Sequence, residues 1–295
     1  MAVPQLLTAE EVTPLREAAV AVLAQWEEGR GAPESTPPPS QNPVSHVMRN
    51  LTHPIYREAG AEHYLRLLEI AASPKLLRVA RAAFGGGEPM FRATSLFFEP
   101  RGVAEGEDSF NGEGEGAWHR DAQFHWSDEE LQRRNIEEQS LHRQGINPEH
   151  HLGLQLQLPL IPDDNLELVP ASYTRWDSEE EYRVRLADGS ANRTSPLPGA
   201  QRMDLEPGDA LCFSPFGLHR GRYRRTHARL TLMVTYRRAD RPLYSGQPWM
   251  LEPGFYSELS PAASRFYRGF ADEHREAMER ERREATAPSQ MSPSL

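Results

Sequence analysis

The chain is poor in cysteine, since Cys212 is the only one among its 295 residues. A single thiol excludes a disulfide within the chain and suits a reducing compartment. Residues 1–12 lack a basic segment followed by a long apolar run, so we expect no secretory signal peptide. No apolar run reaches the roughly 18 residues that a membrane span needs. These absences predict a soluble, cytoplasmic protein with no membrane partner.

Positive charge is also scarce, with 33 Lys and Arg against 43 Asp and Glu and a net charge of -10. This balance argues against nucleic acid as the main partner. Hydrophobic residues make up 38%, which is low for a globular domain but sufficient for a core. We expect a small-molecule substrate and a monomer or homodimer. The local exception is a basic cluster that either binds an anionic substrate group or forms a solvated turn: Arg220, Arg222, Arg224 and Arg225.

The first third of the chain has helical patterns. Residues 8–29 form an amphipathic pattern that begins with a Thr–Glu capping box. Residues 30–45 are rich in Pro, Ser and Gly and predict a loop. Residues 60–84 predict a helix that breaks at the Ser-Pro of 73–74 and stops at the glycines of 85–87. Those glycines follow a helix and lack the Lys-Ser/Thr of a phosphate-binding loop, so they predict a helix stop.

After Pro89 the pattern changes to short, often alternating segments separated by turn residues. The segments are "FRATSLFFE", "WHRDAQFHW", "HLGLQLQLPL", "LELVPAS", "RMDLEPGDALCF" and "RLTLMVTYRR". The alternation is clearest at 152–158, where leucines face one way and Gly153, Gln155 and Gln157 the other. Strands at this spacing predict an all-β sandwich or barrel.

The stretch "AWHRDAQFHW", Ala117 to Trp126, contains a His-x-Asp formed by His119 and Asp121. On a strand these side chains point to the same face, about 7 Å apart at Cα, so both reach one metal ion. A second match, His274 and Glu276, lies in a charged helical run, where residues i and i+2 are about 200° apart. We therefore expect the second match to be a solvated face.

A facial triad needs a third ligand, and His219 follows the apolar strand "GDALCFSPF". Two histidines and one carboxylate leave three positions open on iron, which suits an oxygenase. A closed structural zinc site would instead need four protein ligands, typically with cysteine. Taken alone, a histidine such as His219 is more often a packed or exposed residue.

Arg229 opens the strand "RLTLMVTY" and shares a face with Thr231. An arginine fork with a neighbouring hydroxyl is a good clamp for a carboxylate. Arg229 alone would more often be a surface charge. The ordered set of His-x-Asp, strand pair, strand-His and Arg-x-Thr is much harder to obtain by chance than any one member.

That ordered set resembles the phytanoyl-CoA dioxygenase family of Fe(II)/2-oxoglutarate-dependent oxygenases over roughly residues 60–240. The resemblance includes the helix and first strands in "LLEIAASPKLLRVARAAFGGGEPMFRATSLFFEPRG". It continues through "WHRD", "LGLQLQLPLIPDDNLELVPASY", "GDALCFSPFGLH" and "RLTLMVTY". The chain departs from the family's "PGSH"-like stretch, because it reads "PASY" with Ala171 and Tyr173.

The resemblance implies a mainly β fold with flanking α-helices, a double-stranded β-helix or jelly-roll barrel of the cupin type. It implies that His119, Asp121 and His219 bind Fe(II), and that Arg229 and Thr231 bind the distal carboxylate of 2-oxoglutarate. With O2 as second cosubstrate, the expected reaction hydroxylates an unactivated C–H bond and releases succinate and CO2. Because related halogenases replace the ligand carboxylate by a small residue, Asp121 favours hydroxylation, with desaturation or ring formation left open.

The same reasoning predicts one catalytic domain over 1–295. It consists of N-terminal helices and a Pro-rich loop packed on the barrel over 1–88, a double-stranded β-helix core over 89–245 with a helical insertion at 127–150, and a C-terminal helix with a disordered tail over 246–295.

Further residues are predicted to lie around the candidate metal site. Gln155 is assigned to the 2-oxoglutarate site, although a solvent-facing sheet is the alternative for it. The substrate pocket is predicted to contain Trp118, Gln123, His125, Gln157 and Arg220. If residues 117–126 stay extended, His125 either touches substrate or replaces Asp121 in a three-histidine site. Trp118, Phe124 and Trp126 are predicted to wall the pocket, and packing in the core is the alternative for Trp118 and Phe124.

Two other classes of function fit parts of the pattern. A non-catalytic cupin-like protein would use the barrel to hold a metal or ligand and would need no 2-oxoglutarate clamp. A metal-dependent enzyme that works without 2-oxoglutarate would make Arg229 dispensable. Hydroxylation of a protein instead of a small molecule is a further alternative.

Overall fold

A computed structural model describes residues 1–29, 46–99, 114–124, 126–133, 153–187, 191–224, 226–238, 247–276, 278–279 and 283. The predictions for the Pro-rich loop, for His125, for most of the insertion 127–150 and for the C-terminal tail lie outside these residues. Residues 128–133, at the start of that insertion, are helical. No helix within the described part of the chain is both long and apolar enough to cross a membrane.

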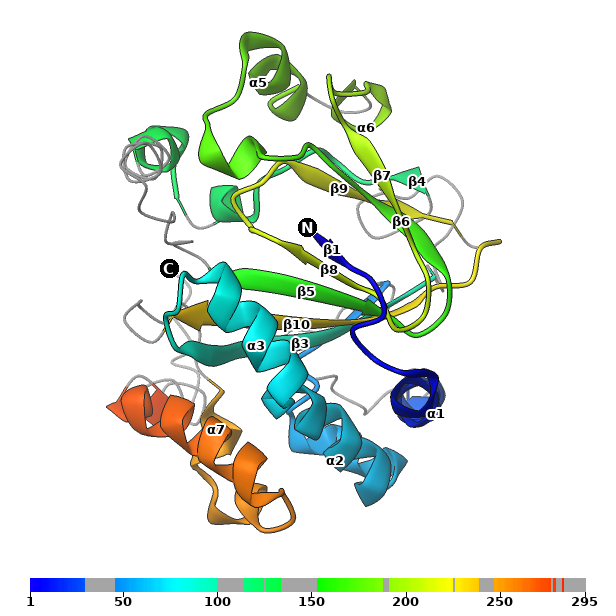
Figure 1. The fold of residues 1–295 in the computed structure, drawn as a ribbon, viewed down its shortest axis with the longest axis vertical. Coiled ribbons are helices and arrows are strands. Elements are labelled where there is room, and N and C mark those ends of the chain that lie inside the picture. Colours follow the sequence, from blue (N-terminus) through cyan, green and yellow to red (C-terminus); the bar gives the residue numbers. More distant parts are fainter. Residues whose placement is uncertain are drawn as a thin grey trace, which may run out of the picture.

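The strands form two antiparallel sheets (Figure 1). The six-stranded sheet has the order β1 (Ala2–Val3), β8 (Ala210–Phe213), β5 (Leu154–Pro159), β10 (Leu230–Arg238), β3 (Pro89–Phe98) and β2 (Val47–Arg49). The four-stranded sheet has the order β4 (Gly114–Glu115), β9 (His219–Tyr223), β6 (Asp163–Leu168) and β7 (Gln201–Leu205). Because the chain crosses between the sheets after β3, β4, β5, β7, β8 and β9, the strands wind into the predicted double-stranded β-helix, or jelly roll.

Helices cover the outside of both sheets (Figure 1). On the side of the six-stranded sheet lie α1 (Ala9–Gly29), α2 (Ala61–Glu69), α3 (Pro74–Ala83) and α7 (Pro261–Glu273). Beyond the four-stranded sheet lie α5 (Glu179–Arg185) and α6 (Ala191–Thr194). Short 3-10 helices complete the connections: η1 (Pro54–Ala59), η2 (Ile70–Ala72), η3 (Asp121–Phe124), η4 (Ser172–Thr174), η5 (Pro248–Leu251) and η6 (Pro253–Tyr256).

The helix boundaries follow local sequence signals. Glu11 Oε2 accepts a hydrogen bond of 2.7 Å from the backbone N–H of Thr8, as half of the predicted capping box. Ser73 Oγ accepts from the N–H of Lys75 at 3.3 Å, directly before α3. The predicted break at Ser73 is therefore confirmed as a new N-cap, and Gly85 and Gly86, with φ of 62° and 95°, stop α3.

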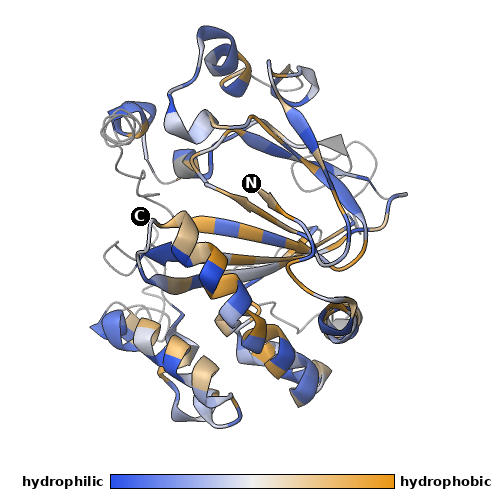
Figure 2. Ribbon diagram, in the orientation of Figure 1, coloured by the Kyte–Doolittle hydropathy of each residue, from blue (hydrophilic) through white to orange (hydrophobic). Residues whose placement is uncertain are grey.

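Strand β5 separates the main apolar core from the space between the two sheets, and its hydropathy alternates along its length (Figure 2). Leu154, Leu156 and Leu158 are at most 2% exposed and belong to the main core under the helices. Burying each contributes about 1.5–3 kcal/mol. Gln155 and Gln157 lie on the opposite face and are 8% and 3% exposed. They face the space between the sheets, not solvent.

The stretch 117–126 is not an extended strand, which corrects the period-two prediction. His119 makes an isolated antiparallel bridge with His219, and the chain then turns into η3. The turn is stabilised locally, because Gln123 N–H donates to the Arg120 carbonyl at 2.9 Å and Gln123 Oε1 accepts from Arg120 N–H at 3.2 Å. Asp121 reaches the site through this turn, so its spacing from His119 is not that of a strand.

Candidate metal centre

The three predicted metal ligands, His119, Asp121 and His219, lie close together. Asp121 Oδ1 lies 3.2 Å from His119 Nε2 and 3.5 Å from His219 Nε2. The ligand atoms of all three residues lie within 4.8 Å of one another, which is close enough to share one ion. Among the described residues this is the one group of His, Cys, Asp and Glu with such geometry.

Backbone pairing brings the two histidines together. His119 and His219 exchange two N–H···O hydrogen bonds of 3.0 Å each, so their side chains stand directly opposite on one face. The ring centroids are 4.3 Å apart. Asp121 is held from the same side, because its N–H donates to the carbonyl of Pro215 at 2.9 Å. The ligand set is therefore built by two chain segments about a hundred residues apart.

Each histidine is oriented through its second nitrogen. His119 Nδ1 lies 2.8 Å from the carbonyl oxygen of Ala117, and His219 Nδ1 lies 2.9 Å from that of Gly217. A carbonyl only accepts, so Nδ1 carries a proton in both rings, and Nε2 is the nitrogen that faces Asp121 and is available to an ion. This is the arrangement that metal-binding histidines adopt.

The carboxylate is oriented by a residue of the other sheet. Gln155 Nε2 donates a hydrogen bond of 2.5 Å to Asp121 Oδ2. This contact leaves Oδ1 directed at the two imidazoles. Gln155 was predicted in the 2-oxoglutarate site, and in the structure it contacts a candidate metal ligand.

The charges within the group are matched. Burial alone would raise the pKa of Asp121, but His219 and His119 outweigh it and hold that pKa well below its usual range. Burial opposes the charged form of His219, yet Asp121 raises the pKa of this imidazole. The site therefore favours a bound positive charge beside an ionised carboxylate.

A buried ion network anchors the turn that carries Asp121. Arg120 is fully buried and binds Asp177 Oδ1 through Nε at 2.9 Å and Nη2 at 2.6 Å. Its Nη1 donates to the carbonyls of Ser172, at 2.9 Å, and Phe216. Arg185 Nε binds the other carboxylate oxygen of Asp177 at 2.7 Å. Arg120 thus ties η3 to the loop before His219.

Arg229, directly before β10, and Thr231 on β10 together hold a carboxylate. That carboxylate belongs to the chain itself. Arg229 Nε lies 3.2 Å from Asp163 Oδ2, and the Thr231 hydroxyl donates to the same oxygen. Asp163 was missed, because nothing in "LIPDDNLEL" distinguishes it from a polar turn until Arg229 is placed beside it. The one signal that the sequence offers for Asp163 is an acidic residue at the start of a buried strand.

The clamp and the triad face a common interior. Tyr223 lies on β9, two residues beyond Gly221 and on the face of His219. Burial raises the pKa of Tyr223, while Arg229 lowers it and Asp121 raises it. Both charges therefore act on the Tyr223 phenol. The ring centroid of Tyr223 lies 3.7 Å from that of His46, a buried residue that was not predicted, with the two ring planes tilted by 38°.

The structure does not bring most of the predicted substrate residues to this interior. Arg220 points to the other face of β9, where it binds Glu167 at 2.6 Å and covers the Trp118 ring at 4.7 Å. Trp118 is fully buried in a small apolar cluster of its own. Gln123 is engaged by Arg120 and Arg185. Of the predicted pocket residues within the described part, Gln157 does face the interior.

The aromatic and basic residues near the candidate ligands lie in different surroundings. Phe124 is 57% exposed and its ring lies 5.5 Å from that of His119, so it shields one side of this ligand. Trp126 packs on Phe216 at 5.9 Å, outside the interior. In the basic cluster, Arg224 forms a half-buried ion pair with Asp164; Arg225 lies outside the described residues.

The second His-x-Glu does not form a metal group, but its environment differs from the prediction. His274 follows the last residue of α7 and packs on the Phe270 ring at 5.2 Å, beside Arg237. Burial, with Arg237 adding, lowers the pKa of His274 to about 4. This histidine is a packed residue at a helix end, not part of a solvated face.

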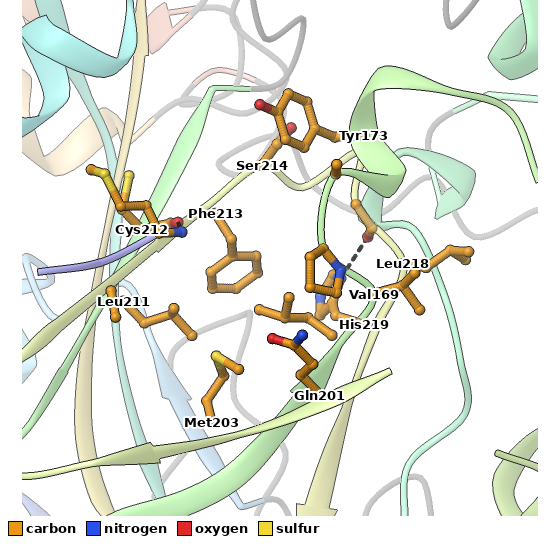
Figure 3. Close-up of a pocket in the computed structure, with 16 residues that line it drawn as sticks. Val169, Tyr173, Gln201, Met203, Leu211, Cys212, Phe213, Ser214, Leu218 and His219 are labelled. Atoms are coloured by element: carbon orange, nitrogen blue, oxygen red, sulfur yellow. Dashed lines mark hydrogen bonds between the residues drawn. The ribbon is translucent and has the colours of Figure 1, made fainter. Parts of the chain in front are cut away.

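A cavity of about 320 Å³ adjoins the candidate metal centre. It lies between strands β1 and β8 of one sheet and the edge strand β7 of the other, and its walls include Met203, Leu211, Phe213 and Leu218 (Figure 3). His219 forms part of the wall, with its ring 5.2 Å from that of Phe213. Mostly apolar side chains line a space that reaches one of the three ligands.

Comparisons with known proteins support the fold. No family model and no curated protein matches the sequence. EctD from S. alaskensis, in a structure with 2-oxoglutarate and 5-hydroxyectoine, matches with 18% identity and a TM-score of 0.52 over 90% of this chain and 82% of that one. EctD with bound Fe matches with 18% identity and a TM-score of 0.51 over 84% and 77%. AviO1 from Streptomyces viridochromogenes Tue57 matches with 16% identity and a TM-score of 0.50 over 82% and 90%.

At these identities the similarity establishes a shared fold. The resemblance to the phytanoyl-CoA dioxygenase family stays a prediction.

Proposed function

We propose that the chain is an Fe(II)- and 2-oxoglutarate-dependent dioxygenase that hydroxylates an unactivated C–H bond of a small molecule and releases succinate and CO2. The convergence of His119, Asp121 and His219 inside a jelly roll is the single observation that carries this proposal. Of the matching structures with this fold, one EctD structure contains 2-oxoglutarate and another contains Fe. We infer a single catalytic domain that includes the helices packed on the sheets.

The donor set fits iron. Two imidazole nitrogens and one carboxylate oxygen form a facial triad that leaves coordination positions open for other ligands. Both imidazoles present Nε2 because their Nδ1 atoms are engaged by backbone carbonyls. No cysteine is in the group, so the site does not resemble a closed structural zinc site.

The donor set at Arg229 and Thr231 fits a carboxylate, since it already holds that of Asp163. Iron with 2-oxoglutarate and O2 would supply the oxidising chemistry. The chain's own part is to hold the metal and to orient the cosubstrate. Gln155 keeps Asp121 aimed at the metal position, and Arg229 and Thr231 direct the distal carboxylate. The apolar cavity beside His219 offers a dry site for a small substrate.

The proposal is tested by anaerobic addition of 2-oxoglutarate to the Fe(II)-loaded protein, watching for the visible charge-transfer absorption of the chelate. We expect absorption in the wild type, none for Asp121→Ala, and a weaker response for Arg229→Ala. His274→Ala is the matched control and should behave as wild type. Folded, iron-loaded wild type without this absorption would exclude the 2-oxoglutarate mechanism.

One observation favours a second candidate. Because Asp163 already neutralises Arg229, the clamp does not need a cosubstrate for charge balance. A cupin-like metal or ligand-binding protein that works without 2-oxoglutarate would have the same ion pair. The titration separates the two, since this second protein would bind iron and show no response to 2-oxoglutarate.

A further inference from the structure

Asp163 fills the carboxylate position of the clamp. Its Oδ2 accepts from Arg229 Nε, at 3.2 Å, and from the Thr231 hydroxyl. Its Oδ1 accepts from the backbone N–H and the side-chain amide of Asn165, at 2.8 and 2.7 Å. Asp163 and Arg229 are 2% and 3% exposed. The pair is therefore buried, charge-neutral and well supplied with hydrogen bonds.

A second carboxylate on Arg229 would meet this one. A buried guanidinium is stabilised by one counter-ion, and the cost of desolvating a second anion is not recovered by a cation that is already paired. The cosubstrate must then either displace Asp163 or share Arg229 with it, at the expense of repulsion between two carboxylates. In both cases Asp163 opposes binding of the distal carboxylate.

The backbone at Asp163 is suited to such a displacement. Asp163 is the first residue of β6 and pairs with Leu205, but the register shifts before the next pair, Leu166 with Met203. A bulge of this kind interrupts the ladder of hydrogen bonds. Asp163 can therefore move without separating β6 from β7 further along.

We propose that Asp163 is an internal competitor for the distal carboxylate of the cosubstrate, so that it sets the affinity of the site for 2-oxoglutarate. This inference rests on the proposed function, which assigns 2-oxoglutarate to the clamp. It predicts that removing the charge of Asp163 tightens binding. If Asp163 instead merely oriented Arg229, its removal would weaken binding.

The experiment compares Asp163→Asn with Asp164→Asn. Asp164 carries the same charge one residue away, but it pairs with Arg224 and with His227 at 3.3 Å, away from the clamp. The Fe(II)-loaded proteins are titrated anaerobically with 2-oxoglutarate, and Tm is measured with and without it. For Asp163→Asn we expect a Kd about ten-fold lower than wild type and a larger rise of Tm, because the ligand neutralises an uncompensated cation. Asp164→Asn should keep the wild-type Kd.

A second ligand tests the inference on the wild type itself. 2-Oxobutyrate can chelate iron but lacks the distal carboxylate, so the ratio of the two Kd values measures what the clamp contributes. We expect a ratio below about ten for the wild type and a clearly larger one for Asp163→Asn. Asp163→Ser replaces Asp163→Asn if the amide variant does not fold.

The outcomes are distinct. A Kd for Asp163→Asn that is unchanged or higher, with 2-oxoglutarate still binding, overturns the competitor role and leaves the proposed function standing. No response to 2-oxoglutarate in wild type and in both Asp163 variants, with iron bound, overturns the proposed function and this inference with it.

Discussion

Gln155 and Gln157 lie two residues apart on the same buried face of β5, but their contacts differ. Gln155 Nε2 donates to Asp121 Oδ2 at 2.5 Å, whereas Gln157 Oε1 has no hydrogen-bond partner among the described residues. The first therefore orients a candidate ligand, and the second is free for a bound molecule. This pair allows one residue to serve as the control for the other.

We predict that Gln155→Leu weakens metal binding about 10- to 100-fold, because the loss of a partner that orients a ligand carboxylate has effects of this size. Gln157→Leu should change metal affinity by less than about three-fold, because Gln157 does not orient a candidate ligand. Anaerobic titration with Co(II), followed by its visible absorption, measures both affinities. Equal losses in the two variants would show that β5 packing, and not the contact with Asp121, was responsible.

His46 carries a prediction about pH. Its imidazole is 5% exposed, and burial, with Arg229 and Arg49 adding, lowers its pKa to about 3. Tyr223 and Phe97 are the rings that face it. The unfolded chain binds a proton near pH 6.5, whereas the folded chain does not. Stability from neutral His46 is therefore complete above pH 6.5 and is lost as the pH falls toward 3.

We expect wild type to lose about 2 kcal/mol more unfolding free energy than His46→Phe between pH 7 and pH 5. Phenylalanine keeps a ring against Tyr223 and does not titrate. Urea unfolding at several pH values gives the comparison. Parallel pH profiles for the two proteins would mean that His46 is protonated in the folded state.

At the scale of elements, Arg120 connects three segments that are distant in sequence. Its guanidinium reaches the carbonyls of Ser172 and Phe216 and the carboxylate of Asp177, while its backbone carries the turn into η3. The position of Asp121 relative to His219 therefore depends on a side chain between the two residues of the His-x-Asp.

Replacing Arg120 by Met should lower the unfolding free energy by about 3–5 kcal/mol, because a buried carboxylate loses a partner. Arg81→Met is the control, since Arg81 pairs with Glu88 at the surface with both side chains about half exposed. Such pairs contribute at most about 1 kcal/mol. Chemical denaturation measures both variants. A similar small effect in each would show that the network around Asp177 does not depend on Arg120.

Whether a feature of the structure can be predicted from the sequence depends on how local its sequence signal is. The break at Ser73 and the alternation of β5 were predictable, because a cap and a period-two pattern act over a few residues. The three candidate ligands were predictable as residue types, and their spacing was consistent with one site. The turn at η3 was not, because it depends on carbonyls of residues 172 and 216, far from Arg120. The Asp163–Arg229 pair was missed for the same reason, since 66 positions separate the partners.

Across the whole molecule, the candidate site joins the two layers of the jelly roll. His119 and His219 belong to the side of the four-stranded sheet, whereas Gln155 projects from the six-stranded sheet onto Asp121. Asp163 of β6 crosses in the same way to Arg229 beside β10. The interior combines polar side chains such as Gln155 and Gln157 with an apolar cluster around Leu211, and the main apolar core lies between the six-stranded sheet and its helices. A ligand at this interior therefore contacts both layers at once.

This arrangement predicts that a bound metal stabilises the entire fold and not a local loop. At a Co(II) concentration about 1,000 times Kd, binding adds about 4 kcal/mol to the unfolding free energy. For a chain of this size that corresponds to a rise in Tm of roughly 8 °C. His219→Ala should lose the rise, and His274→Ala should keep it, because His274 packs at the end of α7 away from the triad. Differential scanning calorimetry with and without Co(II) measures the shift. If one ion stabilises both layers together, the metal-loaded wild type should unfold in a single sharp transition. A rise in Tm that persists in His219→Ala would place the ion elsewhere.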